Sequence, residues 1–248
     1  MANREPKVKV QHLTKKFGDL LVLNDLNFEV QEGEFLCIVG PTGCGKTTFL
    51  NSLTRLYEPT AGDILVNGIP VNPKTQNISY IFQEYSSFPW LTVEQNIRFG
   101  LEIKKVSKAE ADANVEEMLD IVGLTKFRDY YPSQLSISML QRVAIARAFA
   151  TNPELLLMDE PYGQLDIDLR FKLEDELIKL WKKTGTTVLF ITHNIEEAVY
   201  LSQKIMVLTN KPTSVKTILD NPLPLPRDVV SEEFVALRNQ VTDLIKWW

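Results

Sequence analysis

Short apolar runs recur along the chain and are separated by longer stretches with helical spacing of their apolar residues. A run without alternating polar residues is typical of a strand that is buried on both faces of a parallel sheet. Strands of this kind that alternate with helices predict a mostly parallel sheet, with its ligand at the carboxyl edge. The predicted strands are residues 34–39, 78–82, 155–158, 187–191 and 205–208.

The first seventy residues follow a different pattern, because apolar and polar residues alternate there. Residues 8–13 and 27–30 each have this period of two, which predicts half-buried strands, and residues 61–68 predict a strand that leads into a hairpin. We therefore expect an α/β protein, with an N-terminal antiparallel β subdomain beside the mostly parallel core.

Helices are predicted from the period of 3.6 residues and from their caps. Ser107 and Glu110 have the spacing of a capping box and open a helix that extends to about Val122. The stretch of about 84–152 has no strong strand, so we predict that it forms an inserted helical subdomain. The other predicted helices are residues 46–53, 138–150 and 169–183, and an amphipathic helix that carries Phe234, Leu237, Val241, Leu244 and Trp248.

The segment before that last helix is rich in proline, which excludes helix from Asn221 to Arg227. We therefore predict a main domain over residues 1–220, followed over 221–248 by a connector and a C-terminal helix.

Composition narrows the class of function. The chain has 248 residues, of which 44% are hydrophobic and 24% charged, as in an ordinary globular protein. Its net charge of −5 argues against a nucleic-acid partner. We expect a cytosolic location, since there is no apolar run of membrane-spanning length and no apolar N-terminal signal. Cys37 and Cys44 are then expected to stay reduced, without a metal or redox role.

A phosphate-binding loop lies between the predicted strand 34–39 and the predicted helix 46–53. Its glycines allow the backbone to curl so that main-chain N–H groups face phosphate oxygens, and the helix N-terminus adds positive partial charge. Lys46 is expected to reach the β- and γ-phosphates and Thr47 to bind Mg²⁺. A chance glycine-rich turn is the alternative. The predicted ATP-binding residues here are Gly40, Pro41, Thr42, Gly43, Cys44, Gly45, Lys46, Thr47 and Thr48.

Asp159 and Glu160 follow the apolar strand 155–158 and predict the second part of a nucleotide site. Asp159 is expected to hold Mg²⁺ through water. Glu160 is expected to orient or deprotonate the attacking water. The alternative for this acidic pair is a solvated loop.

With these motifs in place, the chain resembles the ATP-binding subunit of an ABC transporter over nearly its whole length. The order of the motifs is that of the family: the loop Gly40–Thr47, then Gln83, then Leu135-Ser136, then Asp159-Glu160, then Leu165-Asp166, then His193. The resemblance implies that residues 1–220 form an ABC ATPase domain with a P-loop NTPase (RecA-like) core. It also implies a dimer of ATPase subunits, transmembrane permease subunits as partners and, indirectly, a substrate-binding protein. It also implies a peripheral position on the cytoplasmic face of the membrane.

The resemblance also implies roles for single residues. Phe17 would stack on adenine, although it could also be ordinary core. Gln83 would contact Mg²⁺ and the transmembrane partner, and His193 the γ-phosphate. Asp166 would join the two halves of a dimer, and Ser136 would meet the nucleotide bound to the other subunit.

Two further segments are similar to those of importers of nitrate, taurine, aliphatic sulfonates and bicarbonate. They are residues 88–97 and residues 159–166, with Gln164 where alanine is more usual. The pair Pro226-Arg227 before a terminal helix fits the same group, some of whose relatives import thiamine precursors or other vitamins. The apolar residues after Gln83 either pack internally or dock a short helix of the partner.

The chain departs from the family at the signature, which usually reads Leu-Ser-Gly-Gly. Here Ile137 and Ser138 replace both glycines. We expect Ile137 to add bulk near the phosphate and to oppose any unusual backbone angle. A homodimer would then hydrolyse ATP slowly, whereas a heterodimer with an intact partner would have one strong and one weak site.

The sequence therefore favours the energising ATPase of an importer. Two alternatives stay open: a non-transport ATPase of the same fold, and a regulatory module that binds ATP with little turnover.

Overall fold

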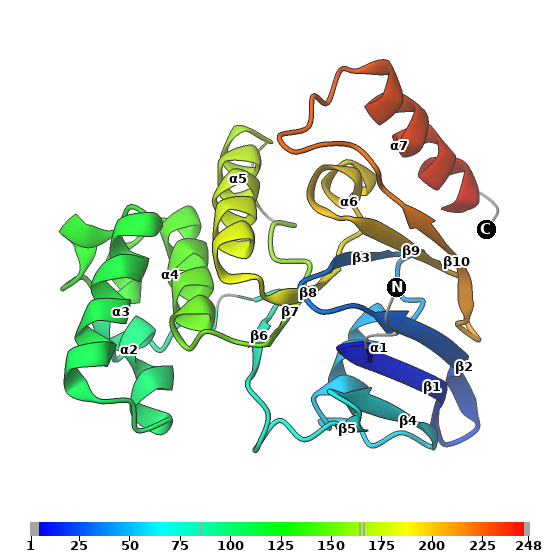
Figure 1. Ribbon diagram of the computed structural model, residues 1–248, viewed down its shortest axis with the longest axis horizontal. Helices are drawn as coiled ribbons and strands as arrows, with labels where there is room; N and C mark the ends of the chain where they lie inside the picture. The colour runs from blue at the N-terminus through cyan, green and yellow to red at the C-terminus, as the bar shows by residue number, and fades with distance from the viewer. Residues whose placement is uncertain (1–4, 85, 164, 166, 246–248) are drawn as a thin grey trace. The chain divides into compact units, whose positions relative to one another are not determined.

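The computed structural model describes residues 5–84, 86–163, 165 and 167–245, so Gln164, Asp166 and Trp248 lie outside the described residues. Backbone contacts divide the chain into two compact units. Unit one combines the chain up to Gln76 with the chain from Thr187 onward, and unit two is Asn77–Thr186. Figure 1 labels the helices and strands of both units. The prediction of a separate segment at 221–248 stays a prediction.

An antiparallel sheet forms the N-terminal part of unit one, with strand order β2-β1-β4-β5. It is longer than the sequence predicted, because β1 runs to Phe17 and β2 begins at Leu20. The reason is a bulge: pairing shifts register near His12 and Asp25, whose φ angles are 51° and 52°. This bulge breaks the alternation that the sequence analysis relied on. The strands are β1 (Val8–Phe17), β2 (Leu20–Val30), β4 (Ala61–Val66) and β5 (Ile69–Pro70).

The second sheet of unit one contains the apolar strands. The central strand β3 pairs in parallel with β8 on one side and β9 on the other, and β10 pairs antiparallel with β9. Each residue of β3 and β8 is buried, which accounts for their unbroken apolar sequence. The strands are β3 (Phe35–Val39), β8 (Thr187–Ile191), β9 (Lys204–Leu208) and β10 (Val215–Asp220).

The helices among the described residues of unit one are α1 (Lys46–Leu53), α6 (Ile195–Leu201) and α7 (Glu232–Ile245). The non-helical connector before α7 is held at the end of α6. Asn221 Nδ2 donates to the carbonyl oxygens of Val199 and Ser202, and Arg227 Nη1 donates to that of Tyr200. These donors satisfy carbonyls at the C-terminal end of α6, which fixes the connector to the core.

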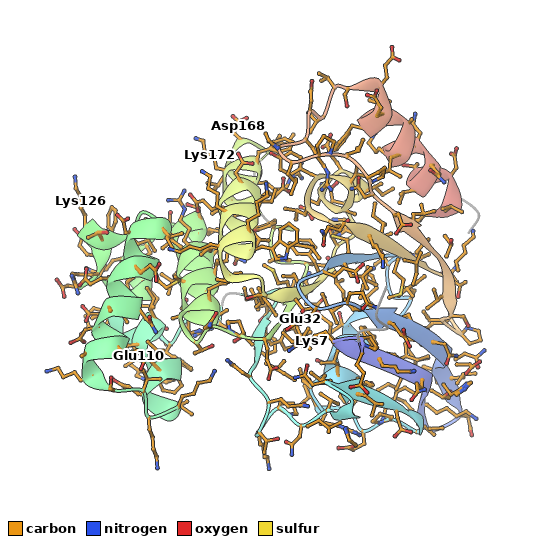
Figure 2. All side chains as sticks on the ribbon, viewed as in Figure 1. Lys7, Glu32, Glu110, Lys126, Asp168 and Lys172 are labelled. Atoms are coloured by element: carbon orange, nitrogen blue, oxygen red, sulfur yellow. The ribbon has the colours of Figure 1, made fainter. Side chains whose placement is uncertain are left out.

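Unit two contains a pair of parallel strands, β6 and β7, and most of the helices of the chain. The predicted helix after Ser107 is confirmed, since its hydroxyl accepts a hydrogen bond from the amide of Glu110. Glu110 and Lys126 project from the helical part and Asp168 and Lys172 from α5, all on exposed faces (Figure 2). The elements are β6 (Ile78–Ile81), α2 (Val93–Ile103), α3 (Lys108–Ile121), η1 (Thr125–Phe127), η2 (Pro132–Gln134), α4 (Ile137–Ala150), β7 (Leu155–Asp159) and α5 (Ile167–Thr184).

Among the residues that the structure describes, no helix combines the length and apolar content that a membrane crossing requires.

Candidate functional site

The phosphate loop follows β3 directly and ends where α1 begins at Lys46. Gly45 has a φ of 122°, in the region that favours glycine, and a Cβ at this position would lie 3.0 Å from Val22 Cγ1. At Gly40 a Cβ would lie 3.1 Å from that of Leu208 and 3.2 Å from Cys44 Sγ. These two glycines are therefore required by backbone angle at Gly45 and by close packing at both positions.

Lys46 holds this loop together. Its side chain is 5% exposed, and Nζ donates to the carbonyl oxygens of Gly40 (3.0 Å) and Pro41 (3.3 Å). Helix α1 has Gly45 as its N-cap residue, with no side-chain hydrogen bond at that end. A helix N-terminus whose N-cap residue has no capping side chain is an arrangement that suits a phosphate.

Cys44 contributes main-chain groups to the loop rather than a reactive thiol. The residue is buried, and Thr213 Oγ1 donates to its carbonyl oxygen. Burial raises the pKa of the thiol, although the nearby charge of Lys46 acts in the opposite direction. Thr47 is exposed at the start of α1, so its hydroxyl is accessible to a bound ligand.

His193 lies at the same sheet edge as the phosphate loop. Strand β8 pairs with β3 so that Ile191 is opposite Ile38, and the amide of Thr192 donates to the carbonyl oxygen of Ile38 (3.3 Å). The carboxyl ends of both strands therefore meet, with exposed His193 two residues beyond Ile191. The structure thus brings the loop and His193 together at one edge.

Phe17 ends β1 and is 42% exposed, so its interpretation as ordinary core is wrong. Its ring meets that of Tyr57 edge-on at 5.2 Å between centroids, and Lys15 Nζ lies 4.8 Å from its centroid. An exposed, oriented aromatic ring with a neighbouring cation can stack on a planar group such as adenine.

The acidic pair belongs to unit two. Asp159 ends β7 and is 3% exposed, so the alternative of a solvated loop is wrong for it. Its Oδ2 accepts a hydrogen bond from Tyr80 Oη (3.3 Å), and the pKa of Tyr80 is raised by burial and by the charge of Asp159. Glu160 has a φ of 46°, an uncommon left-handed conformation for a non-glycine residue. Tyr80 was missed by the sequence analysis because a tyrosine in a strand carries no distinct pattern.

Gln83 lies at the same edge as the acidic pair. Strands β6 and β7 are parallel, with Ile81 opposite Met158, so Gln83 and Glu160 each follow by two residues. Gln83 is exposed. Within unit two, the structure therefore brings the predicted metal and catalytic residues Gln83, Asp159 and Glu160 to one edge.

The segment that the sequence predicts as the signature lies at the start of α4. Ser136 is the N-cap residue, and its hydroxyl accepts from the amide of Met139 (3.4 Å) and is 3.0 Å from that of Ser138. Ile137 is the first helical residue and is 51% exposed. The expectation that Ile137 opposes an unusual backbone angle is wrong for this structure, because an ordinary helical first turn suits it. Asp166 lies outside the described residues.

The similarity of this chain to known proteins identifies its family. Residues 23–163 match the family model described as "ABC transporter", which is more than half of the chain. The chain belongs to the ABC transporter family of ATP-binding proteins. It is 44% identical, over 97% of this chain and 91% of the relative, to an uncharacterized ABC transporter ATP-binding protein of Methanocaldococcus jannaschii. It is 40% identical to the aliphatic sulfonates import ATP-binding protein SsuB of Bacillus cereus, over 93% and 91% of the two chains.

Solved structures agree with this assignment. The dimeric ATP-binding cassette MJ0796, in a post-hydrolysis state bound to ADP and Pi, has a TM-score of 0.76 and 33% identity, covering 86% of this chain and 98% of that one. CbiO1 of Clostridium perfringens has a TM-score of 0.81 over 97% and 98% of the two chains, and at 24% identity it shows the fold alone. The α/β fold class predicted from the sequence is therefore confirmed, and the protein is an ABC ATPase that binds ATP.

Proposed function

We propose that this protein is the ATP-hydrolysing subunit of a membrane importer for a small anionic solute, such as a sulfonate or nitrate. The observation that carries the proposal is the 40% identity to the sulfonate importer ATPase over 93% of this chain. The segment 88–97 and the pair Pro226-Arg227 support the same group. A vitamin precursor is the second class of solute that the resemblance allows.

The proposed catalytic roles follow from the residues at the two sheet edges. In unit one, the amides at Gly43–Thr48 and the Lys46 ammonium would bind the phosphates, His193 would contact the γ-phosphate, and Phe17 would stack on adenine. In unit two, Glu160 would orient the attacking water and accept its proton. Positioning and charge neutralisation are sufficient for this chemistry, since phosphoryl transfer needs little covalent help.

Each unit offers oxygen donors of the kind that magnesium prefers. Unit one has the exposed hydroxyl of Thr47, and unit two has the buried carboxylate of Asp159 and the amide oxygen of exposed Gln83. The hydrogen bond from Tyr80 holds Asp159 in one orientation, as an outer partner of a metal ligand does. We propose Thr47 and Gln83 as direct magnesium ligands and Asp159 as a ligand that acts through water. A bound magnesium ion would neutralise phosphate charge.

An exposed aromatic surface supports a permease as the partner. Trp90 is 69% exposed and Phe82 45%, and the rings of Phe88 and Trp90 are 5.5 Å apart. Aromatic residues are enriched at interaction surfaces, so the exposed Trp90 beside Phe88 supports a partner here. A helix of a permease at the cytoplasmic face of the membrane would bind here, and a substrate-binding protein would set the specificity of the complete importer.

The signature of this chain supports a weak contribution to a nucleotide bound by a second ATPase subunit. Ser136 retains its hydroxyl, but Ile137 and Ser138 add side chains where the family has glycines. A homodimer would then be slow. A heterodimer with a subunit of intact signature would have one strong site, with Asp166 joining the halves.

The test is purification of the tagged chain from membranes together with its genetic neighbours, followed by measurement of ATP turnover in the complex. The proposal predicts copurification of an integral membrane protein and turnover stimulated by a solute-loaded binding protein. Copurification of ribosomes or DNA instead would favour the non-transport ATPase. A complete complex that binds ATP without turnover would favour the regulatory module.

A further inference from the structure

The side chain of Arg147 connects helix α4 to the segment that follows Gln83. Its Nη1 donates to the carbonyl oxygen of Ser86 (2.8 Å), and its Nη2 donates to Ser86 Oγ (2.7 Å). The centre of the guanidinium also lies 5.0 Å from the ring centroid of Phe88. Two hydrogen bonds and a cation–π contact therefore fix residues 86–88 to α4.

Arg147 differs from the other arginines of unit two in having none of the described carboxylates as a partner. On the same helix, Arg142 pairs with Glu176 at 3.2 Å, and both Arg98 and Arg128 pair with Glu94. Burial of Arg147 lowers the pKa of its guanidinium. A cation removed from water needs replacement partners, and here Ser86 and the Phe88 ring supply them. The hydrogen bonds and the ring contact of Arg147 are therefore made to residues 86–88.

The segment has a shape of its own, which Asn96 of α2 fixes. Asn96 is fully buried, its Oδ1 accepts from the amide of Phe88 (2.8 Å), and its Nδ2 donates to the carbonyl oxygens of Phe88, Leu91 and Thr92. Residues 86–92 are therefore a preformed turn, which we call the docking segment. Arg147 ties this turn to α4 without being needed to shape it.

Helix α4 joins the docking segment to the signature turn. Ile137 and Arg147 are ten residues apart on one continuous helix, which corresponds to about 15 Å. A helix of this length moves as a unit, so a displacement at Arg147 also displaces the start of α4. The hydroxyl of Ser87 is buried with no hydrogen-bond partner among the described residues, so the polar groups of the docking segment are not all satisfied in this arrangement.

We propose that Arg147 is a positioning residue that fixes the docking segment to α4, so that binding of a partner there and binding of nucleotide at the signature turn influence each other. The coupling rests on the proposed function, since it needs a nucleotide. The attachment of the segment to α4 does not, because it lies wholly within unit two.

Hydrogen–deuterium exchange of the full chain tests both parts. Without nucleotide, Arg147→Ala is expected to raise exchange in residues 84–92 about tenfold or more, since two charge-assisted hydrogen bonds are lost. Arg147→Lys should restore part of the protection. The matched control is Arg142→Ala, which removes an arginine of the same helix and should leave 84–92 unchanged. Unchanged exchange in Arg147→Ala, or an equal rise in all peptides of unit two, would overturn the attachment.

Addition of a non-hydrolysable ATP analogue with Mg²⁺ tests the coupling. In the unchanged chain, exchange should alter both at 134–141 and at 84–92, whereas in Arg147→Ala it should alter at 134–141 alone. A response at 84–92 that survives in Arg147→Ala contradicts the coupling. If the nucleotide changes hydrogen exchange nowhere in the chain, both the proposed function and the coupling are contradicted. The attachment of the docking segment to α4 is still tested by the exchange measured without nucleotide. If Arg147→Ala does not fold, the double variant Ser86→Ala/Phe88→Leu removes the hydroxyl and ring contacts of Arg147 from the other side, and exchange in 84–92 should again rise.

Discussion

Two helices of this protein begin at segments that we propose for nucleotide binding, and their first turns differ. Helix α1 begins after Gly45, which has no side chain to cap the helix. Helix α4 begins after Ser136, whose hydroxyl accepts from the amide of Met139, and an exposed Ile137 follows at once. We call the uncapped N-terminus of α1 the open end and the capped N-terminus of α4 the covered end.

The difference shows what the glycines of such motifs do. Any helix N-terminus has unsatisfied amides and positive partial charge. At α1, the N-cap residue is a glycine, so no N-cap side chain competes with a ligand for these amides. At α4, Ser136 satisfies one amide locally, and Ser138 occupies the Ser136 hydroxyl with a hydrogen bond of 3.0 Å. We therefore expect the N-terminus of α1 to bind a phosphate more strongly than the N-terminus of α4.

The substitution Glu160→Gln is expected to lower the rate of ATP hydrolysis without changing nucleotide affinity. Nucleotide binding at the two helix ends can then be measured without hydrolysis. We expect turnover to fall about 10²–10⁴-fold, as for loss of a general base, with nucleotide affinity unchanged. Phosphate release and the equilibrium binding of an ATP analogue measure the two quantities. Glu176→Gln, a glutamate of the same unit that contacts Arg142 at 3.2 Å, is the control and should retain turnover. Retained turnover in Glu160→Gln would refute the assignment of the base.

Lys46→Ala tests the open end of α1 directly. Because the ammonium donates charge-assisted hydrogen bonds, each worth about 1.5–3 kcal/mol, nucleotide affinity should fall about 10–100-fold. Calorimetric titration measures this change. Lys104→Ala is the matched control, since Lys104 also donates to a main-chain carbonyl, that of Thr151 at 3.2 Å, but lies in unit two. Equal affinity in Lys46→Ala and the unchanged chain would show that α1 does not bind the phosphates.

The open end of α1 was predictable from the sequence, and the covered end of α4 only in part. The octapeptide Gly40–Thr47 lies between an apolar strand and a helix, so local pattern was enough to locate it. At α4 the sequence showed that glycines were absent, but it did not show that Ser136 would cap the helix and that Ile137 would fit its first turn. Capping depends on side-chain rotamers, which residue spacing alone does not determine.

Elsewhere the sequence analysis failed where the local pattern was short or exposed. Helix α6 has only seven residues, and β10 is half-exposed along its length, so neither has a clear period. Helix α2 begins with a complete capping box of Thr92 and Gln95, a signal in the sequence that could have located its start. The contact of Arg147 with Ser86 spans 61 residues and has no local pattern at all.

Ile137→Gly/Ser138→Gly converts the covered end of α4 into one like α1. If the side chains are what weakens this end, turnover of the assembled ATPase should rise, by about tenfold for each 1.4 kcal/mol of improved transition-state binding. Steady-state turnover with and without the genetic neighbours measures this effect. Ile103→Gly, at an exposed isoleucine that ends α2, controls for the loss of an apolar surface residue and should leave turnover unchanged. An unchanged rate in the double-glycine variant would show that the side chains of Ile137 and Ser138 do not weaken the N-terminus of α4.

The smallest expected effect is a pH dependence of stability at the open end of α1. Burial raises the pKa of Cys44 above its ordinary value of 9.0. The unfolded chain therefore loses this proton at lower pH than the folded chain, so stability is fully present below about pH 9 and declines above it. The melting temperature of Cys44→Ala should consequently fall less between pH 8 and pH 10 than that of the unchanged chain. Equal slopes would mean that the thiol is ionised alike in both states, and the loop would then be more open to water than the 1% exposure of Cys44 implies.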